Sequence, residues 1–194
     1  MRLPGLFLLV TLPLPAQNVI LEIAPSAENR ISLEVAKTGL LSGKKHLFVL
    51  EKYSGRVELD KSNPDKSRVE LTMDPASLLV KDDWLSAKDA KKVQEEASVK
   101  MLAVNQFREM TFRSTSVRSI AIDRYTVEGM LTIRGIARPV TLEVTMRDYR
   151  FEGSGVFKMS SYGLKPPSAA LGAVGTKDEM TVRFQLVATP RPGL

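Results

Sequence analysis

Alternation of apolar and polar side chains, repeated along most of the chain, is the feature that most constrains the fold. It is clearest in GMLTIRGIARPVTLEV, residues 129–144, where Leu131 and Ile133 share one face before a break and Leu142 and Val144 share one face after it. Successive side chains of a strand point to opposite faces, so this segment predicts two half-buried strands joined by a turn.

The break between these two strands carries residues that are typical of a turn. Glycine can adopt a positive φ at no steric cost, which suits Gly135 to the turn, and we expect Pro139 at the start of the second strand, where its missing N–H does least harm. The alternation itself leaves one question open, which is whether the apolar face packs into a core or lines a space for a ligand.

Strand-like segments recur at short spacing along most of the remaining sequence. One of them, residues 46–60, is apolar on both faces at its beginning, and Gly55 predicts a bend within it. Short strands separated by turns are typical of a β-sandwich or β-barrel, so we expect an all-β fold of about eight antiparallel strands. The predicted strand segments are 18–24, 29–36, 46–60, 68–73, 108–117, 124–133, 138–147, 151–163 and 179–188.

One segment, residues 85–102, lacks strand alternation and is rich in helix-forming residues. Ser86 followed three residues later by Asp89 resembles a capping box, which indicates a helix start. Val93 and two alanines form a narrow apolar stripe between charged residues. We therefore expect one helix over residues 86–100, packed on the side or the mouth of the barrel.

The N-terminal segment MRLPGLFLLVTLPLPAQN resembles a secretory signal. Arg2 precedes an apolar run from Leu6 to Leu14, and Ala16 supplies the small residue expected before a cleavage site. The run is too short to cross a bilayer. We therefore expect a signal peptide over residues 1–16, a single domain over 17–189 and a tail over 190–194, with a periplasmic or secreted product and no stable membrane span.

Composition excludes several kinds of site. The chain has no cysteine and one histidine, His46, so it forms no disulfide and has no cysteine nucleophile or two-histidine zinc motif. The net charge is +6, but the longest basic runs are Lys44-Lys45 and Lys91-Lys92. Dispersed charge is typical of a solvated surface, so we expect no nucleic-acid partner. We also expect no enzyme activity, no cofactor and no bound metal.

Four motifs carry a family resemblance. The hairpin at 129–142 reads G-x-LTIRG-x-x-RPVTL, with DPASL at 74–78, REMTFRSTSV at 108–117 and SSYGL at 160–164. Their order resembles the YceI-like family of lipid-binding proteins, and the resemblance runs from about residue 18 to 189. It implies an extended lipocalin-like β-barrel, export to the periplasm, and an internal apolar channel for polyisoprenoid chains of quinone or prenyl-phosphate type.

Two positions depart from the family's pattern, because Arg108 stands where proline is usual and Ser161 stands where an acidic residue is usual. These departures concern the ligand's head group rather than the fold. The chain has only 7 Phe, 4 Tyr and 1 Trp. Walls of aliphatic and flexible methionine side chains suit a long apolar chain better than a stacked ring.

The main hypothesis is a carrier of a long-chain isoprenoid or other lipid, held in the barrel interior. Lys45 and His46 are the candidates for contact with a polar head group, and Tyr162 is expected beside them at the mouth. The predicted ligand-binding residues are Phe48, Leu50, Val69, Leu71, Met73, Phe112, Leu131, Ile133, Leu142, Val144, Tyr162, Phe184 and Leu186.

Other functions stay open on the sequence alone. One alternative is a closed-barrel interaction or stress-related structural module that holds no small molecule. A weaker alternative is an enzyme acting on a prenyl head group through His46, which requires that histidine to face the cavity beside a carboxylate. The sequence also leaves open whether the protein forms a homodimer.

Overall fold

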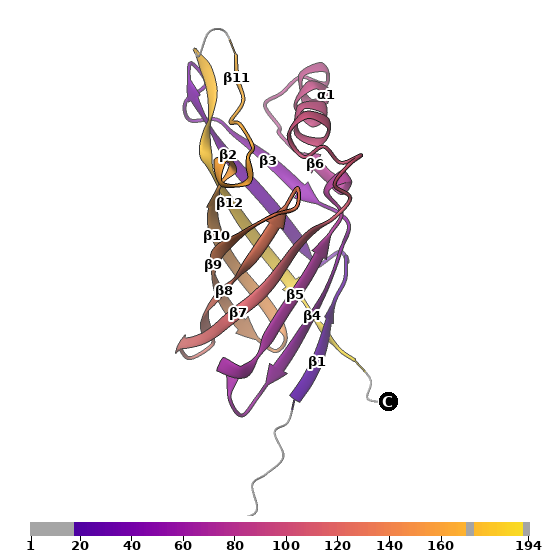
Figure 1. Ribbon diagram of the computed structural model, residues 1–194, viewed down its shortest axis with the longest axis vertical. Coiled ribbons are helices and arrows are strands. Elements are labelled where there is room, and N and C mark those ends of the chain that lie inside the picture. Colours follow the sequence, from indigo (N-terminus) through magenta and orange to yellow (C-terminus); the bar gives the residue numbers. More distant parts are fainter. Residues whose placement is uncertain (1–17, 170–172, 192–194) are drawn as a thin grey trace, which may run out of the picture.

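Figure 1 shows the computed structural model, which describes residues 18–169 and 173–191. The described residues form thirteen β-strands and one α-helix, and the all-β fold class is confirmed. The predicted signal peptide lies outside the described residues. The elements are β1 (Asn18–Ile23), β2 (Arg30–Gly39), β3 (Lys45–Leu50), β4 (Tyr53–Asp60), β5 (Arg68–Met73), β6 (Leu78–Val80), α1 (Ala87–Glu95), β7 (Met110–Ala121), β8 (Arg124–Ile133), β9 (Ile136–Arg147), β10 (Arg150–Lys158), β11 (Ser168–Ala169), β12 (Val174–Val187) and β13 (Thr189–Pro190).

The strands pair in antiparallel fashion and close on themselves. β13 follows β12 after one residue and pairs with β1, which places Pro190 opposite Leu21. The pairing therefore forms a circuit, β1-β4-β5-β7-β8-β9-β10-β12-β13, that returns to β1. Strands β2, β3 and β6 extend the sheet from β12, outside this circuit. The prediction of an antiparallel barrel is confirmed, but the count of about eight strands was too low because it missed β6, β11 and β13 and took β3 and β4 as one strand.

The end of the described chain helps to close the barrel. Pro190 and Arg191, which we expected in a tail, lie beside β1, and the N–H of Arg191 donates to the carbonyl of Ile20 at 2.8 Å. Alternation did not reveal this pairing, because two or three residues are too few to show a period. Residues 192–194 lie outside the described residues.

The β8–β9 hairpin forms as predicted around a two-residue turn. Arg134 and Gly135 both have positive φ, 52° and 74°, as the favoured hairpin turns require. Pro139, however, lies inside β9, opposite Met130, rather than at the start of the strand. Because β10 pairs with β9 only from Leu142 onward, Pro139 lies where β9 has a partner on one side only, and such an edge tolerates proline.

The segment 46–60 contains two strands instead of one bent strand. Its break falls at Glu51 and Lys52, between β3 and β4, whereas Gly55 lies within β4. A Cβ atom at Gly55 would lie 2.9 Å from Cδ1 of Leu71 on the neighbouring strand β5. This glycine therefore allows two strands to pack closely and does not mark a bend.

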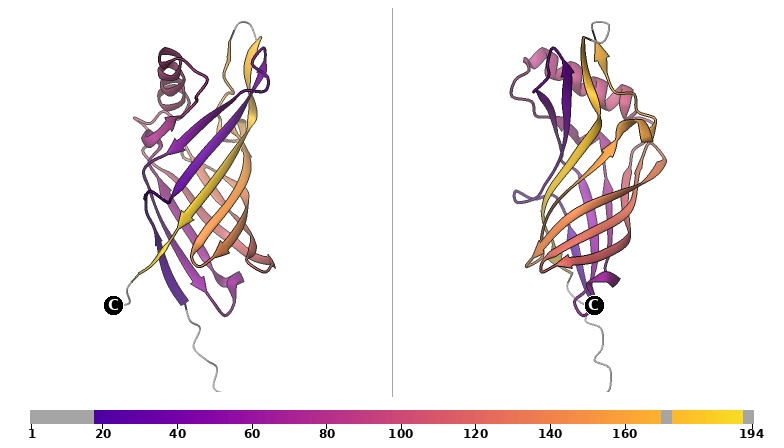
Figure 2. Two further views of the ribbon diagram at one scale, coloured as in Figure 1. Left: turned by 180° about the vertical axis from the view of Figure 1, so that it is seen from behind. Right: turned by 90° about the vertical axis from the view of Figure 1, so that its left-hand side faces the viewer.

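The predicted helix forms at the upper end of the barrel (Figures 1 and 2). The Ser86 hydroxyl accepts from the N–H of Asp89 at 3.1 Å, so the predicted cap is confirmed. After Glu95 the helix widens into one π-helical segment, Glu96–Met101. Gln94 fixes the helix beside β6, because its side-chain amide bonds the backbone of Leu78 and Val80 at 2.7 and 2.8 Å.

Candidate functional site: an apolar cavity inside the barrel

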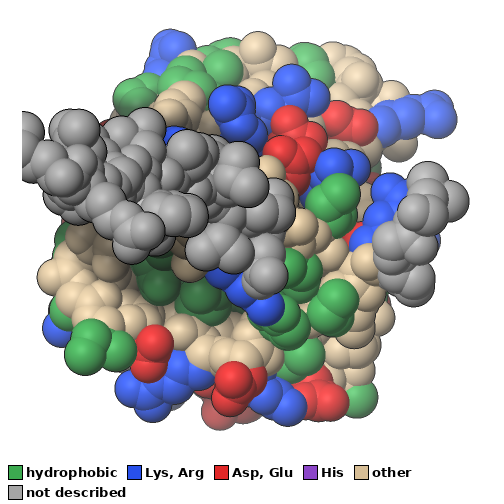
Figure 3. All heavy atoms as spheres, turned by 90° about the horizontal axis from the view of Figure 1, so that it is seen from below, with side chains coloured by type: hydrophobic (Ala, Val, Ile, Leu, Met, Phe, Trp, Pro, Cys, Tyr) green, Lys and Arg blue, Asp and Glu red, His purple; other side chains and the backbone are tan. Residues whose placement is uncertain are grey.

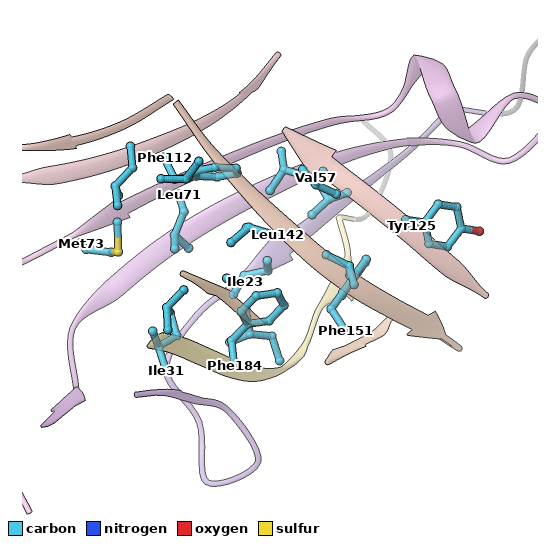
Figure 4. Close-up of a pocket in the computed structure, with 18 of the residues that line it drawn as sticks. Ile23, Ile31, Val57, Leu71, Met73, Phe112, Tyr125, Leu142, Phe151 and Phe184 are labelled. Atoms are coloured by element: carbon cyan, nitrogen blue, oxygen red, sulfur yellow. The ribbon is translucent and has the colours of Figure 1, made fainter. Parts of the chain in front are cut away.

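A cavity of about 170 Å³ lies inside the barrel. None of the described residues that line it carries a charge, and only Ser67 and Tyr125 bring a hydroxyl to the wall. The Ser67 hydroxyl already accepts from the N–H of Asp60 at 3.1 Å. Figure 4 shows the wall, with Met73 and Phe112 toward one end and Tyr125 toward the other. The interior is therefore suited to apolar atoms and offers little to a polar group.

Most of the predicted ligand-binding residues lie on this wall. Glu143 and Arg183, which alternate with wall residues along β9 and β12, line a hollow on the outer face of the sheet instead. The prediction of which side chains face inward is therefore correct on β9 and β12. The predicted residues that line the cavity are Leu50, Val69, Leu71, Met73, Phe112, Leu131, Ile133, Leu142, Val144, Phe184 and Leu186.

The wall also contains residues that were not predicted to bind the ligand. Tyr125 and Val127 precede Leu131 on β8 in the same phase, and Met146 follows Val144 on β9. Counting in steps of two from a predicted wall residue finds all three. Residues such as Val57 and Leu59 were harder to assign, because the segment 46–60 was read as one strand of uncertain phase.

Three glycines shape the inner surface of the wall. A Cβ atom at Gly129 would lie 2.5 Å from Cζ of Phe112, and one at Gly153 would lie 2.5 Å from Cζ of Phe184. A Cβ atom at Gly155 would meet Leu142 at the same distance. The two phenyl rings therefore lie flat against backbone that has no side chain, and the glycines keep the interior from filling completely.

Four predicted residues are not among those lining the cavity. Phe48 is buried on β3 opposite Leu33 and shares the face of Leu50, but unlike these two residues it is not among those that line the cavity. Lys45 is exposed and its ammonium group pairs with the Glu34 carboxylate at 2.8 Å. The predicted contacts of Phe48 with the chain and of Lys45 with a head group therefore lack support in the geometry.

His46, the other head-group candidate, is buried and occupied by partners within the chain. Its Nδ1 lies 2.5 Å from Oδ2 of Asp82, and Oδ1 of Asp82 accepts from the N–H of Leu47 at 2.6 Å. The ring of Trp84 stacks on the imidazole, with 5.4 Å between ring centroids. Burial lowers the pKa of the nearby Lys37 ammonium, and the charge of Asp82 opposes that shift.

This arrangement corrects the expectation that His46 lies at the mouth of the cavity. The carboxylate partner comes from a loop 36 residues away, so the sequence around His46 gave no sign of it. The histidine does have a carboxylate beside it, but it is not among the residues that line the cavity. The pair joins the start of β3 to the loop before α1, and its role in this geometry is structural.

Tyr162 lies behind the wall, not at its mouth. The residue is 1% exposed, and its hydroxyl has no hydrogen-bond partner among the described residues. Its ring packs edge-on against Phe157, a wall residue, with centroids 5.7 Å apart. Burial raises the pKa of Tyr162 to about 12, and the charge of Arg138 opposes that shift.

A second, larger hollow of about 640 Å³ lies on the outer face of β2, β8, β9, β10 and β12, with one residue each from β3 and β7. Opposite charges are interspersed along its length, because its charged residues are Arg30, Glu34, Arg124, Glu143, Glu152 and Arg183. It is more open than the interior cavity and has no continuous apolar wall. Size alone therefore does not identify the ligand site, and the enclosed apolar interior is the better candidate.

Over residues 18–169 and 173–191, no helix is both long and apolar enough to cross a membrane. The same stretch contains no group of three or more histidine, aspartate or glutamate side chains placed to share a metal ion.

The fold and the site together define an antiparallel β-barrel that encloses an apolar cavity. A family model described as a YceI-like domain matches residues 24–188. The match covers most of the chain, which therefore belongs to the YceI-like family, as the four motifs indicated.

Relatives share about a quarter of their residues with this chain. A UPF0312 protein of Pseudomonas putida is 26% identical over 127 residues, which is 60% of this chain and 62% of the relative. A UPF0312 protein of Yersinia enterocolitica is 29% identical over 58% of this chain and 59% of the relative. Protein YceI of Salmonella arizonae is 26% identical over 69% of each chain. The matches to the first two thus span less than two thirds of those relatives' length.

Solved structures share the fold. The crystal structure of Burkholderia cenocepacia BcnA has a TM-score of 0.65 at 23% identity, covering 84% of this chain and 98% of that chain. A Campylobacter jejuni YCEI protein has a TM-score of 0.58 at 15% identity, covering 75% of this chain and 85% of that chain. At these identities the likeness concerns the fold and carries no ligand with it.

Proposed function

We propose that this protein binds one long apolar chain, such as a polyisoprenoid, a quinone tail or an acyl chain, inside the barrel and carries it through the periplasm. The observation that supports the proposal most directly is the charge-free wall of the cavity. Ligand sites in proteins are concave and mainly apolar, and a closed barrel of about eight strands is just wide enough to hold one slender ligand.

The size of the cavity indicates how a chain is accommodated. Its volume of about 170 Å³ is close to that of an engineered cavity of about 150 Å³ that binds benzene, so the space present suits about one isoprene unit. A longer chain has to displace side chains. Met73, Met110 and Met146 all line the cavity, and methionine changes rotamer readily. The interior is therefore adaptable as well as apolar.

The energetics of burial support a chain of two or three isoprene units. Each buried CH₂ group contributes about 0.8 kcal/mol, so one five-carbon unit contributes about 4 kcal/mol before losses. Two or three units offset the entropy of association and bring the dissociation constant to about micromolar. This estimate requires no charged contact, which agrees with the absence of charged side chains from the described wall.

The polar end of the ligand is assigned to the end of the cavity near Tyr125 and Ser67. These two residues bring the only hydroxyl groups to the described wall. His46 and Lys45 are engaged by Asp82 and Glu34 and take no part. The proposed function is one of binding and transport without catalysis, with residues 1–16 acting as the signal for export.

One observation favours a second candidate, a filled barrel that acts as an interaction module. A volume of about 170 Å³ is small for an extended lipid, so the side chains fill much of the interior. The two candidates differ in a direct measurement. Mass spectrometry of an organic extract from protein purified out of its native cells gives a stoichiometric long-chain lipid if the barrel is a carrier, and none if it is filled.

Volume-increasing substitutions test which residues the chain contacts. Leu131→Trp and Val144→Phe place a larger ring in the cavity and should abolish retention of a long-chain prenol, at a cost of about 1–3 kcal/mol in stability. Met130→Trp is the matched control, because Met130 lies next to Leu131 on β8 and faces outward. It should retain the prenol as wild type does.

The outcome that contradicts the carrier hypothesis is equally definite. If Leu131→Trp and Val144→Phe unfold cooperatively, as wild type does, and still retain the prenol at wild-type stoichiometry, the chain does not occupy this cavity. The filled-barrel module then takes its place.

A further inference from the structure

Three turns meet at the lower end of the barrel, opposite α1 (Figure 1). The N–H of Ser119 donates to Oδ1 of Asp65 at 2.9 Å, which joins the β4–β5 turn to the end of β7. Nε of Arg147 donates to Oδ2 of Asp123 at 3.0 Å, which joins the β9–β10 turn to the β7–β8 turn. These contacts make one continuous surface. We call it the turn end, and it consists of residues 61–68, 118–124 and 147–150.

Two isoleucines are exposed at the turn end. Ile122, in the turn from β7 into β8, is 90% exposed, and Ile120, near the end of β7, is 55% exposed and also borders the outer hollow. A single exposed apolar residue needs no explanation, but two at the tip of one hairpin place their apolar area on the outermost part of the molecule.

The turn end is rich in basic residues. It contains seven lysine or arginine residues and three aspartates, a net charge of +4, which becomes +2 when Glu128 and Glu28, the partners of Arg118 and Arg150, are included. Asp65 and Asp123 are engaged in the contacts between the turns. Lys66 and Arg68 make no ion pair within the described residues, so their charges face solvent. Arg124 makes none either, but it lines the outer hollow with Glu143 and Glu152.

The opposite end of the barrel also carries basic residues. The segment from Lys81 to Met101, which includes α1, has five lysines and five acidic residues, a net charge of zero. The β2–β3 hairpin, residues 37–45, adds three lysines and no acidic residue, and it contains Leu40, which is 83% exposed. Exposed apolar residues beside basic ones therefore occur at both ends, and two exposed isoleucines on one hairpin distinguish the turn end.

The interior cavity reaches the turn end. Pro64 and Ser67 of the β4–β5 turn belong to its wall, as do Val117, near the end of β7, and Tyr125, near the start of β8. Figure 3, which views the molecule from this end, shows apolar side chains in a hollow with charged side chains around its edge. A chain that leaves the cavity at this end emerges between the basic turns.

We propose that the turn end docks onto the surface of a bilayer that contains anionic phospholipid. Ile122 and Ile120 insert at the level of the acyl chains, while Lys66 and Arg68 contact the phosphates. The charge complementarity commits the surface to an anionic bilayer, because each basic residue near such a surface favours binding about fivefold. Docking brings the cavity opening against the membrane from which a chain is drawn, and in this respect the inference extends the proposed function. The transfer of a chain rests on the proposed function, whereas the docking itself does not.

Cosedimentation with vesicles of phosphatidylcholine, with and without phosphatidylglycerol, tests the docking. Wild type should sediment with the anionic vesicles at low salt and be released at high salt, because counterions screen exposed charges. Ile122→Asp should lower the partition coefficient about tenfold or more, since it replaces an inserted apolar group with a charge. Leu40→Asp, the same change at the opposite end, should stay within about twofold of wild type.

A second pair of variants separates charge from apolar insertion. Lys66→Glu should weaken binding to anionic vesicles by more than tenfold, because it changes the charge by two. Lys91→Glu on α1 makes the same charge change at the other end and should have little effect. Equal losses in Lys66→Glu and Lys91→Glu would show that attraction is diffuse and would overturn the assignment to the turn end.

Tryptophan fluorescence reports which end inserts. The native Trp84 lies beside Lys45 at the α1 end, so its emission should not change when vesicles are added. Ile122→Trp in a Trp84→Phe background should shift to shorter wavelength on anionic vesicles. A shift of native Trp84, with none at position 122, would place the docking surface at the wrong end.

Two further outcomes separate docking from self-association and from lipid retention. Wild type could instead form a dimer that Ile122→Asp converts to a monomer in analytical ultracentrifugation. If it does so and binds neither kind of vesicle, the β7–β8 turn binds a second copy and the docking proposal fails. Val144→Phe, which blocks the cavity, should still dock. If wild type retains lipid but does not bind vesicles, the docking proposal fails and the proposed function stands. If wild type binds vesicles but retains no lipid, the proposed function fails and the docking proposal stands.

Discussion

At the scale of single residues, Tyr162 gives the sharpest expectation about pH. Burial raises its pKa from 10.0 to about 12, and burial also raises the pKa of Tyr53. Because the unfolded chain releases these protons first, the contribution of the two tyrosines to the free energy of unfolding should be constant below pH 10 and fall as pH rises from 10.0 toward 12. Tyr162→Phe should make that fall shallower in denaturant titrations at several pH values.

The same substitution should not destabilise the protein at neutral pH. The Tyr162 hydroxyl has no partner among the described residues, so replacing it with hydrogen removes a desolvated group and breaks no hydrogen bond. A loss of more than about 1 kcal/mol at pH 7 would show that an ordered water satisfies this hydroxyl. Phe157→Leu, which changes the ring beside it, serves as a control for packing.

Single residues also show which structural features can be predicted from the sequence. Leu131 and Leu142 were placed on the wall correctly, because a strand reverses its side chains at every step and the phase is local information. His46 was misplaced, because its partner Asp82 lies 36 residues away and the pairing depends on how two segments fold together. Local pattern predicts the face of a strand but not the contacts between distant segments.

At the scale of elements, Asp82 fastens the α1 segment to the barrel. Its side chain is fully buried and bonds both His46 and the backbone N–H of Leu47. Asp82→Ala leaves both donors without an acceptor and should lower the free energy of unfolding by about 1–3 kcal/mol. Amide exchange should accelerate from β6 through α1, and Trp84 emission should shift to longer wavelength.

The neighbouring aspartate is the matched control for this prediction. Asp83 is exposed, so Asp83→Ala should change stability by less than about 0.5 kcal/mol. Equal effects of Asp82→Ala and Asp83→Ala would show that the loop before α1 is stabilised by net charge and not by the bonds to β3.

Elements were predicted unevenly, for physical reasons. The β8–β9 hairpin and the capped helix were found because each has a strong local signal, a two-residue turn in one case and a serine cap in the other. The division of residues 46–60 into β3 and β4 was missed, because both strands begin or end in buried positions and their alternation is weak. The short strands β6, β11 and β13 depend on neighbours that are remote in sequence.

At the scale of the whole molecule, the order of the strands in the barrel shows that one contact crosses its lower opening. The β4–β5 turn and the β9–β10 turn are separated by half of the circuit, so they lie on opposite sides of the barrel. Nevertheless Nζ of Lys61 in the first turn lies 5.4 Å from the ring centroid of Tyr149 in the second. This cation–π contact therefore crosses the opening, and a chain that enters or leaves at this end has to break it.

Breaking that contact should change rates without changing affinity. A cation–π contact at an exposed site is worth about 0.5–1 kcal/mol, so Lys61→Ser should speed both entry and release of a chain by about two- to fivefold. Because the contact closes over the empty and the occupied barrel alike, the two rates should rise together and leave Kd unchanged. Stopped-flow fluorescence with a conjugated polyene fatty acid measures both rates, and Lys88→Ser on α1 is the control. Faster release with unchanged entry would instead make Lys61 a ligand contact, and unchanged rates would mean that the chain does not pass through this opening.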